Sequence, residues 1–153
     1  MVASQAGEWY RSDTPAGPLF HAQLYAGQEN SGKLVTLIKQ QARAWGRDRG
    51  AEFVFLDGPP GIGCPVIAAS TGATLALSVT EPTVSGLHDL WRALATVQHF
   101  GVPAVVCVNK VDLNPRRSAE LATECQARDL PIVGRLPFDH RVTEAMVNGV
   151  PIT

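Results

Sequence analysis

Two polar motifs of this sequence each follow directly after a short apolar run, and their residue types suit nucleotide binding. The first, Asp57-Gly58-Pro59-Pro60-Gly61, comes after the apolar residues 53–56. A carboxylate in this position can hold Mg²⁺, directly or through water, beside the phosphates of a nucleotide. The two glycines let backbone N–H groups approach a terminal phosphate. The same residues also suit an ordinary loop whose aspartate caps the next helix.

The second motif, Asn109-Lys110-Val111-Asp112, follows the apolar residues 104–108. In this N-K-x-D pattern the aspartate can accept hydrogen bonds from a purine edge. The asparagine amide offers a donor and an acceptor, and the lysine stem can pack on the base. A plain polar turn is the alternative reading of the four residues alone. Their occurrence after a strand, two strands beyond the first motif, favours a nucleotide site.

A third stretch, residues 27–33, matches the phosphate-binding pattern G-x-x-x-x-G-K. In a true phosphate loop Gly32 and Lys33 would contact phosphate, and a serine or threonine would follow to bind Mg²⁺. The next residue here is Leu34. The competing interpretation is a helix N-terminus capped by Asn30 or Ser31, with the lysine exposed.

The elements that position these motifs alternate between apolar strands and helices. The polar stretch at the start predicts a β-hairpin, and the spacing of apolar residues after it predicts a helix. From residue 53 onward, strands and helices alternate, which predicts an α/β fold with a three-layer parallel sheet. The predicted strands are 9–11, 19–25, 53–56, 75–79, 104–108 and 132–136, and the predicted helices are 31–47, 87–100, 115–128 and 142–147.

The motifs all follow the carboxyl ends of predicted strands. Parallel strands place these ends at one edge of the sheet, where ligands of such folds bind. We therefore expect Asp57, Gly61, Asn109 and Asp139 to converge there. The stretch Thr80-Glu81-Pro82-Thr83-Val84-Ser85-Gly86 also ends a strand, and it suits either a place beside the nucleotide or a plain capped turn.

The composition predicts one domain spanning residues 1–153 and limits the classes of partner. Charged residues make up 18% of the chain, below the usual figure of about 25%, which suggests that some surface is buried against a partner. The net charge of −1 indicates neither a nucleic-acid partner nor a membrane surface. Cys64, Cys107 and Cys125 are too widely spaced for a zinc or iron–sulfur site formed by this chain alone, and they favour a reducing cytoplasm. Cys64 suits a small buried residue.

Several ordered motifs, from about residue 9 to residue 152, resemble a known group. The stretches D-G-P-P-G-I-G-C-P-V, V-T-E-P-T-V-S-G-L-H-D-L, V-N-K-V-D-L-N and G-R-L-P-F-D are similar to the MinD/Mrp superfamily (SIMIBI) of P-loop ATPases, in particular to members with an inserted ferredoxin domain. The stretch E-N-S-G-K-L-V is similar to that group too. Such proteins begin with a phosphate loop, K-G-G-x-G-K-T, followed by a cysteine-rich insert that binds iron–sulfur clusters. Neither occurs in this sequence, so the chain corresponds to the C-terminal part of the family domain.

The resemblance implies a role for each motif. Asp57 would be the Walker B carboxylate, catalytic and on the Mg²⁺ side of the site, with Gly58, Pro59, Pro60 and Gly61 beside the phosphates. Asn109, Lys110 and Asp112 would lie by the base. The loop of Pro137, Phe138 and Asp139 would close over the base and read adenine through its backbone. Asp112 would then turn to solvent or cap the helix that begins near Pro115. Residues 27–33 follow the insert in that family and are not its main phosphate loop.

Three hypotheses about function follow. The chain resembles an ATPase that uses ATP and Mg²⁺ in a cytoplasmic cycle of dimerisation, linked to iron–sulfur or redox proteins. Iron–sulfur clusters themselves are expected only in the full-length family. N-K-x-D also suits a GTPase. The lack of K-G-G-x-G-K-T favours a non-catalytic interaction module, either a homodimer or one half of a protein completed by a companion chain. We expect any bound nucleotide to be adenine-based.

Overall fold

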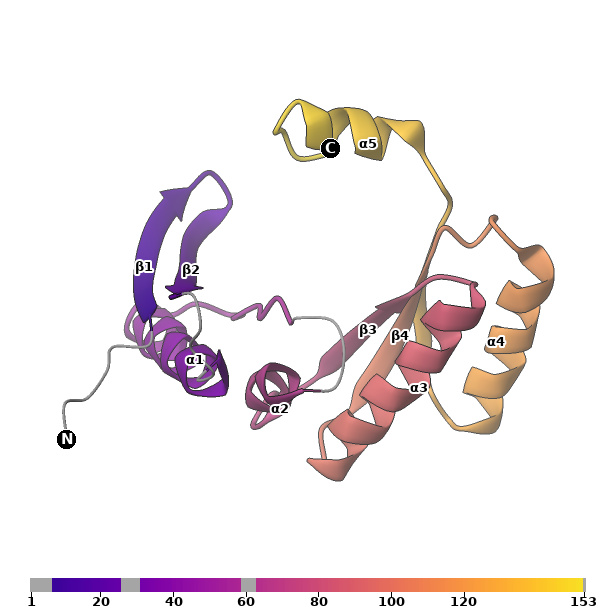
Figure 1. Cartoon of the computed structure of the whole chain (residues 1–153), viewed down its shortest axis with the longest axis horizontal. Coiled ribbons are helices and arrows are strands. Elements are labelled where there is room, and N and C mark those ends of the chain that lie inside the picture. Colours follow the sequence, from indigo (N-terminus) through magenta and orange to yellow (C-terminus); the bar gives the residue numbers. More distant parts are fainter. Residues whose placement is uncertain (1–6, 26–30, 59–62, 153) are drawn as a thin grey trace. The chain divides into compact units, whose positions relative to one another are not determined.

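The computed structural model describes residues 7–25, 31–58 and 63–152 of the chain. The chain forms two compact units, Met1–Ala73 and Thr74–Thr153, which are described separately below (Figure 1). The expectation that residues 1–153 form a single domain stays a prediction. Within the described residues, no helix is both long and apolar enough to cross a membrane.

The first unit begins with the predicted hairpin. Strands β1 (Gly7–Thr14) and β2 (Gly17–Leu24) pair antiparallel along their whole length. Gly17 has a φ of 119°, which a side chain would strain, so the tight turn depends on this glycine. Trp9 and Phe20 stack across the strands with ring centroids 6.5 Å apart. The hairpin prediction is therefore confirmed, with strands longer than the motif suggested.

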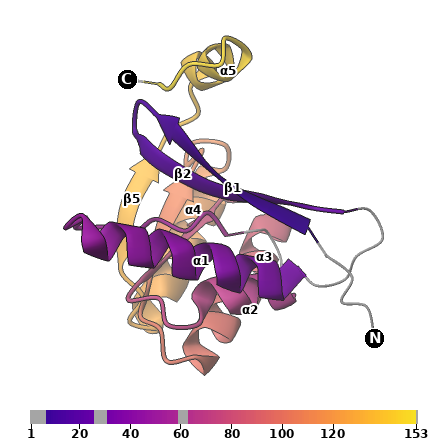
Figure 2. The same cartoon turned by 90° about the vertical axis from the view of Figure 1, so that its left-hand side faces the viewer.

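Helix α1 (Ser31–Asp48) confirms the predicted helix and packs against β2 (Figure 2). A second helix, α2 (Cys64–Ser70), was not predicted, because seven residues that include a proline carry too little periodicity. The two helices are joined by Lys39, which is only 6% exposed. Its ammonium group donates to the carbonyl oxygens of Ala68 and Thr71, so it caps the C-terminal end of α2. Burial lowers the pKa of Lys39, and nearby Arg43 lowers it further.

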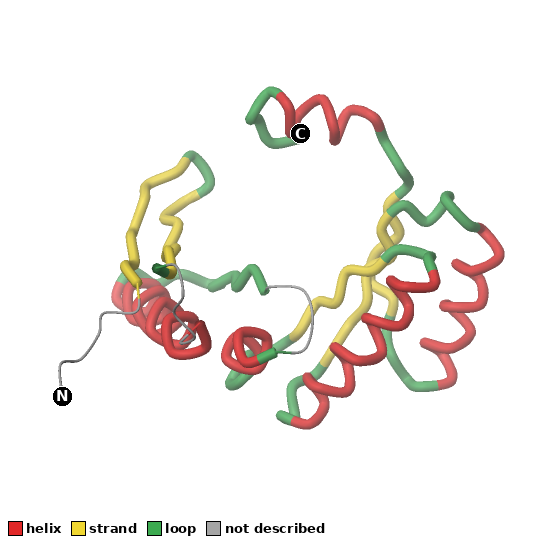
Figure 3. Tube along the Cα trace, in the orientation of Figure 1, coloured by secondary structure: helices red, strands yellow, loops and turns green. Residues whose placement is uncertain are grey.

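The predicted strand at residues 53–56 is wrong. This segment has no strand partner among the described residues and runs as a loop (Figure 3). Phe53 and Phe55 are 73% and 89% exposed, and their rings stack on each other at 6.0 Å. An apolar run becomes a buried strand only when neighbouring strands satisfy its backbone and cover its side chains.

The second unit is an α/β structure. Its strands β3 (Ala76–Thr80), β4 (Ala104–Asn109) and β5 (Ile132–Leu136) form a parallel sheet in the order β3-β4-β5. Its helices are α3 (Val84–His99), α4 (Pro115–Ala127) and α5 (His140–Val147). Three of the four predicted parallel strands are thus confirmed, and the three predicted helices lie within a few residues of their expected bounds.

The core of this unit lies between the sheet and helices α3 and α4, which cover one sheet face (Figure 1). Buried side chains from α3, β4, α4 and the segment between α4 and β5 form it: Leu90, Leu94, Val106, Val108, Leu121, Cys125 and Leu130. Residues on the other face of β3 are exposed, Leu77 by 57% and Val79 by 61%. The third layer of the expected architecture stays a prediction.

Candidate functional site

The candidate site lies where β3, β4 and β5 end. Asn109 is the last residue of β4 and pairs with Leu136, the last residue of β5. The backbone N–H of Val111 donates to the carbonyl oxygen of Leu136 at 2.9 Å, which extends the contact between the two chain segments beyond the sheet. The loops that follow Asn109 and Leu136 are therefore held side by side, as the parallel order predicts.

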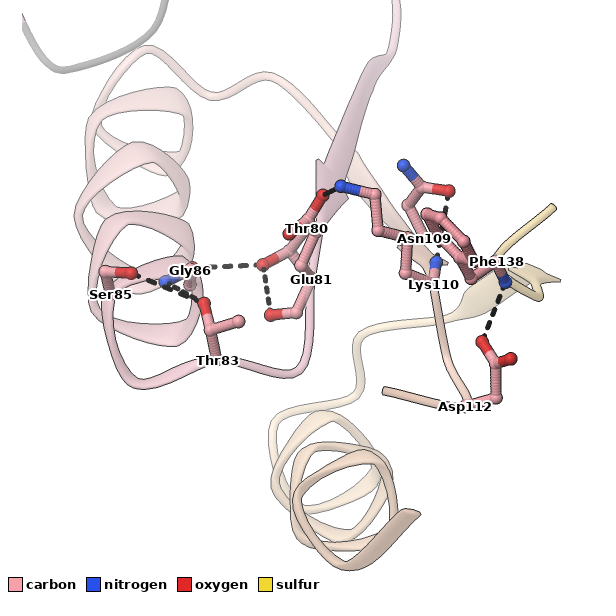
Figure 4. A network of polar contacts seen from close by, with 9 residues as sticks. All are labelled: Thr80, Glu81, Thr83, Ser85, Gly86, Asn109, Lys110, Asp112 and Phe138. Atoms are coloured by element: carbon pink, nitrogen blue, oxygen red, sulfur yellow. Dashed lines mark hydrogen bonds and ion pairs between the residues drawn. The ribbon is translucent and has the colours of Figure 1, made fainter. Parts of the chain in front are cut away.

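Lys110 links the loop after β4 to the loop after β3. Its Nζ lies 2.5 Å from the Oε1 atom of Glu81, and both side chains are about one third exposed (Figure 4). Because water screens this pair, we expect it to add no more than about 1 kcal/mol to stability. Lys110 has a φ of 52°, an unusual backbone conformation for a residue with a side chain. The oxygen Oδ1 of Asn109 accepts from the N–H of Lys110 at 3.1 Å, which supports that conformation.

Asp112 contacts the loop after β5. Its Oδ1 accepts a hydrogen bond from the backbone N–H of Phe138 at 2.7 Å (Figure 4). Asp112 is exposed, as one of the two alternatives expected, but it does not cap α4. Asn114 is the residue that caps α4, since its Oδ1 accepts from the N–H of Arg117.

The stretch after β3 is a capped turn that also carries an ion-pair partner of the site. Thr83 caps α3, because its hydroxyl oxygen accepts from the N–H of Gly86 at 3.0 Å. Thr80 donates its hydroxyl to the carbonyl oxygen of Gly86. A Cβ on Gly86 would lie 2.6 Å from the carbonyl oxygen of Glu81, so only glycine fits this close approach. The turn therefore fixes the backbone from which Glu81 reaches Lys110.

Asp139 has a structural role at the start of α5. Its Oδ1 accepts from the N–H of Arg141, which caps the helix, and the same carboxylate pairs with the guanidinium of Arg141 at 2.5 Å. These hydrogen bonds, with the side-chain contact the larger, lower the pKa of Asp139 from 3.8 to about 2. The carboxylate is thus engaged with its own helix.

We expect Arg141→Ala to return the pKa of Asp139 from about 2 toward its ordinary value of 3.8. Because the folded pKa lies below 3.8, the contact stabilises the fold above that pH and its contribution disappears as the pH falls toward 2. Carboxyl chemical shifts recorded by NMR against pH would measure this. Arg135→Ala, which removes another arginine of the same unit, should leave the pKa of Asp139 unchanged. An equal shift in both variants would contradict the assignment.

Other predicted site residues lie in the first unit. Asp57 and Gly58 are exposed and belong to no helix or strand, whereas Pro59, Pro60 and Gly61 lie outside the described residues. The expected convergence of Asp57 and Gly61 with Asn109 stays a prediction.

Gly32 and Lys33 belong to the first turn of α1, and Lys33 is exposed. They line a shallow groove between α1 and α2, together with Cys64 and Thr71 among others. Cys64 is exposed, so the expectation that it is buried is wrong. Within residues 7–25, 31–58 and 63–152, no group of three or more His, Cys, Asp or Glu side chains is arranged to hold a metal ion.

Two residues with important contacts escaped the sequence analysis. Glu81 was predicted only as part of a turn with two possible roles. Because it follows β3, and β3 pairs with the strand that precedes Lys110, its position could have predicted the ion pair with Lys110. Lys39 lies within the predicted helix 31–47, and nothing in its local sequence indicates that it caps a helix end near Ala68, 29 residues away.

Comparisons with known proteins identify relatives at low identity. An uncharacterized ATP-binding protein of Methanocaldococcus jannaschii is 27% identical over 104 residues, covering 66% of this chain and 38% of the relative. A cytosolic Fe-S cluster assembly factor Nubp1 homolog of Drosophila grimshawi is 24% identical over 153 aligned positions, which cover 86% of this chain and 48% of the relative. A chloroplastic septum site-determining protein minD homolog of Arabidopsis thaliana is 26% identical over 105 residues, which cover 66% of this chain and 32% of the relative. These distant similarities support a relation to the MinD/Mrp type of P-loop ATPase.

The chain spans about a third to a half of the length of the curated proteins it matches. No family model matches the sequence, and no solved structure matches it. The α/β unit with its parallel sheet is compatible with a P-loop fold.

Proposed function

We propose that this chain binds an adenine nucleotide at the carboxyl ends of β4 and β5, as part of an ATPase of the MinD/Mrp type. The observation that carries the proposal is the pairing of the Asn109 loop with the Phe138 loop at one sheet edge, through the Val111–Leu136 and Asp112–Phe138 hydrogen bonds. One relative is named as an ATP-binding protein, which supports the choice of ligand.

The chemistry of this edge suits a purine. Asn109 uses its side-chain oxygen within the loop, and no partner of its Nδ2 donor occurs among the described residues. Phe138 is 41% exposed and follows β5, the strand paired with β4, so part of its ring is open for a base to stack on. In the proposed complex the amide of Asn109 and the backbone after β5 read the edge of adenine.

The phosphate and Mg²⁺ side of the site is a further part of the proposal. Asp57 would hold Mg²⁺, directly or through water, with Gly58, Pro59, Pro60 and Gly61 near the phosphates. A carboxylate that follows an apolar segment suits this role, since oxygen ligands are preferred by Mg²⁺. A bound Mg²⁺ would neutralise phosphate charge. A link to iron–sulfur or redox proteins is proposed because one relative is named as an Fe-S cluster assembly factor, and because of the family resemblance.

Titration of the purified chain with ATP and GTP tests the base-binding proposal. We expect ATP to bind more tightly than GTP, by about tenfold or more, equivalent to about 1.4 kcal/mol. Asn109→Ala should weaken ATP binding by about tenfold, because it removes a base-reading amide. Gln98→Ala, which removes an exposed amide from α3, is the matched control and should bind as the wild type does. Absence of ATP binding in the wild-type chain, or equal losses in both variants, would refute the proposal.

A second candidate function is that of an interaction module completed by a companion chain. Phe55 is 89% exposed, and Leu77 and Val79 on the second unit are 57% and 61% exposed. Parallel strands are normally covered on both faces, and large exposed apolar patches mark binding surfaces. The relatives are at least about twice as long as the chain, which favours a companion that supplies a strand and helix from the rest of such a protein.

Dye binding and native mass spectrometry test this candidate. If a companion is needed, the chain alone should be a monomer that binds the hydrophobic dye ANS. Phe55→Glu and Leu77→Glu should each lower the dye signal, whereas Leu113→Glu, at an exposed leucine of the β4–α4 loop, should not. A stable homodimer would instead assign these surfaces to a second copy. A monomer that binds no dye would show that the chain covers them by itself.

A further inference from the structure

The Asp112 carboxylate lies between two loops of the proposed nucleotide site. It belongs to the loop after β4, and its Oδ1 accepts from the backbone N–H of Phe138 at a distance of 2.7 Å. Val111, the residue before Asp112, donates its N–H to Leu136, so the Asp112 hydrogen bond extends the contact between the loop after β4 and the loop after β5. An acceptor that carries a charge makes this hydrogen bond stronger than a neutral one.

No other part of the loop needs the Asp112 side chain. Asn114 caps α4, and Ser118 donates its hydroxyl to the carbonyl oxygen of Val111, so both ends of the loop are held by other residues. The Lys110 ammonium group pairs with Glu81. The structure therefore uses the charged members of the N-K-x-D motif to connect one loop to its neighbours.

This arrangement conflicts with guanine recognition by Asp112. A carboxylate that reads guanine accepts from both N1–H and N2–H₂, which requires its two oxygens to face the base together. Here Oδ1 faces the backbone of Phe138. A guanine would have to displace that contact and leave the N–H of Phe138 to find another partner. Adenine has no N1–H donor, so it makes no such demand.

We infer that Asp112 is a positioning residue that fixes the Phe138 loop for adenine, and that it does not read the base. The inference rests on the proposed nucleotide site, because it assigns the specificity of that site. Asp112 acts only through the backbone of Phe138. The positioning role requires Oδ1 of Asp112 as the acceptor for the N–H of Phe138, and it does not require the second oxygen, Oδ2.

Two substitutions separate positioning from base reading. Asp112→Asn keeps an acceptor oxygen at the same place, whereas Asp112→Ala removes it. We expect Asp112→Ala to weaken ATP binding by about tenfold and Asp112→Asn to stay within about threefold of the wild type. ATP should bind more tightly than GTP and xanthosine triphosphate in all three proteins. Asp89→Ala, at an exposed aspartate of α3, is the control and should change nothing.

Guanine recognition predicts a different pattern. Xanthine carries a carbonyl group at C2 where guanine carries an amino group, so an asparagine amide can donate where the carboxylate accepted. A wild-type chain that prefers GTP, with Asp112→Asn shifted toward xanthosine triphosphate, would overturn the inference. Equal loss of ATP binding in Asp112→Asn and Asp112→Ala would also overturn it, since the charge and not the acceptor would then matter.

Hydrogen exchange of the Phe138 amide, measured by NMR on the nucleotide-free chain, keeps the two proposals distinguishable. We expect Asp112→Ala to speed this exchange by about tenfold and Asp112→Asn to speed it much less. An unchanged exchange rate in Asp112→Ala would overturn the positioning role whether or not nucleotide binds. If the wild-type chain binds no nucleotide while Asp112→Ala still speeds the exchange, the proposed function and the base specificity are refuted. The hydrogen bond of Asp112 to the Phe138 loop would still be supported.

Discussion

Leu121→Ala is expected to lower the free energy of unfolding of the β3–α5 unit by about 2–5 kcal/mol. Leu121 is 0% exposed and lies in the core cluster that α3 and α4 build on β4. Truncation removes three methyl or methine carbons and leaves a cavity that α4 cannot close without losing its contact with the sheet. Urea unfolding followed by circular dichroism would measure the change.

Leu113→Ala is the matched control for this prediction. Leu113 is 53% exposed in the loop before α4, so its truncation should cost no more than about 0.5 kcal/mol. Similar losses in the two variants would mean that the assigned core is wrong. A loss of less than about 1 kcal/mol for Leu121→Ala would contradict the close packing of α4 on the sheet.

The second unit was largely predictable from the sequence, because its local signals agree with its tertiary structure. The runs that became β3, β4 and β5 are short and apolar, and each is followed by a helix with a cap. Thr83, Asn114 and Asp139 each accept a hydrogen bond from the first turn of a helix. Pro115 then suits the first helical position, where its missing N–H costs nothing.

The first unit was less predictable, because its key features depend on contacts far apart in sequence. Phe53 and Phe55 belong to an apolar run that satisfies the strand pattern, yet no described strand pairs with it. A strand is a property of two chain segments, so an apolar run alone cannot establish one. Lys39 shows the same limit for a helix, since its carbonyl partners lie on α2.

The candidate site shows which part of a motif can be predicted. The types and order of Asn109, Lys110 and Asp112 predicted that these side chains end a strand together, and the structure confirms that placement. Their partners were not predictable from the tetrapeptide. Phe138 lies 26 residues from Asp112, and Glu81 comes from a different strand end. The motif therefore identified the place, whereas the use of each side chain depends on which loops the fold brings beside it.

The purified chain, supplied with ATP and Mg²⁺, is expected to hydrolyse ATP more slowly than about 10⁻³ s⁻¹, near the intrinsic rate of a phosphate-loop GTPase without its activating partner. Phosphoryl transfer depends on positioning and on neutralising phosphate charge. The proposed site supplies a base-binding edge and one carboxylate, Asp57, for Mg²⁺. In the G-K stretch, Leu34 occupies the position of the Mg²⁺-binding serine or threonine, and the Lys33 side chain is exposed in the first turn of α1.

Phosphate release by the wild type and by Lys33→Ala decides between the two readings of residues 27–33. We expect the same slow rate for both proteins, because Lys33 serves no phosphate cradle. Arg47→Ala, which removes another cation near the other end of α1, is the matched control. Turnover of about 1 s⁻¹ or faster, lost in Lys33→Ala and kept in Arg47→Ala, would show that Gly32 and Lys33 form a working phosphate loop. The absence of a serine or threonine after the lysine would then be compensated by another Mg²⁺ ligand, and Asp57→Asn should abolish that turnover as well.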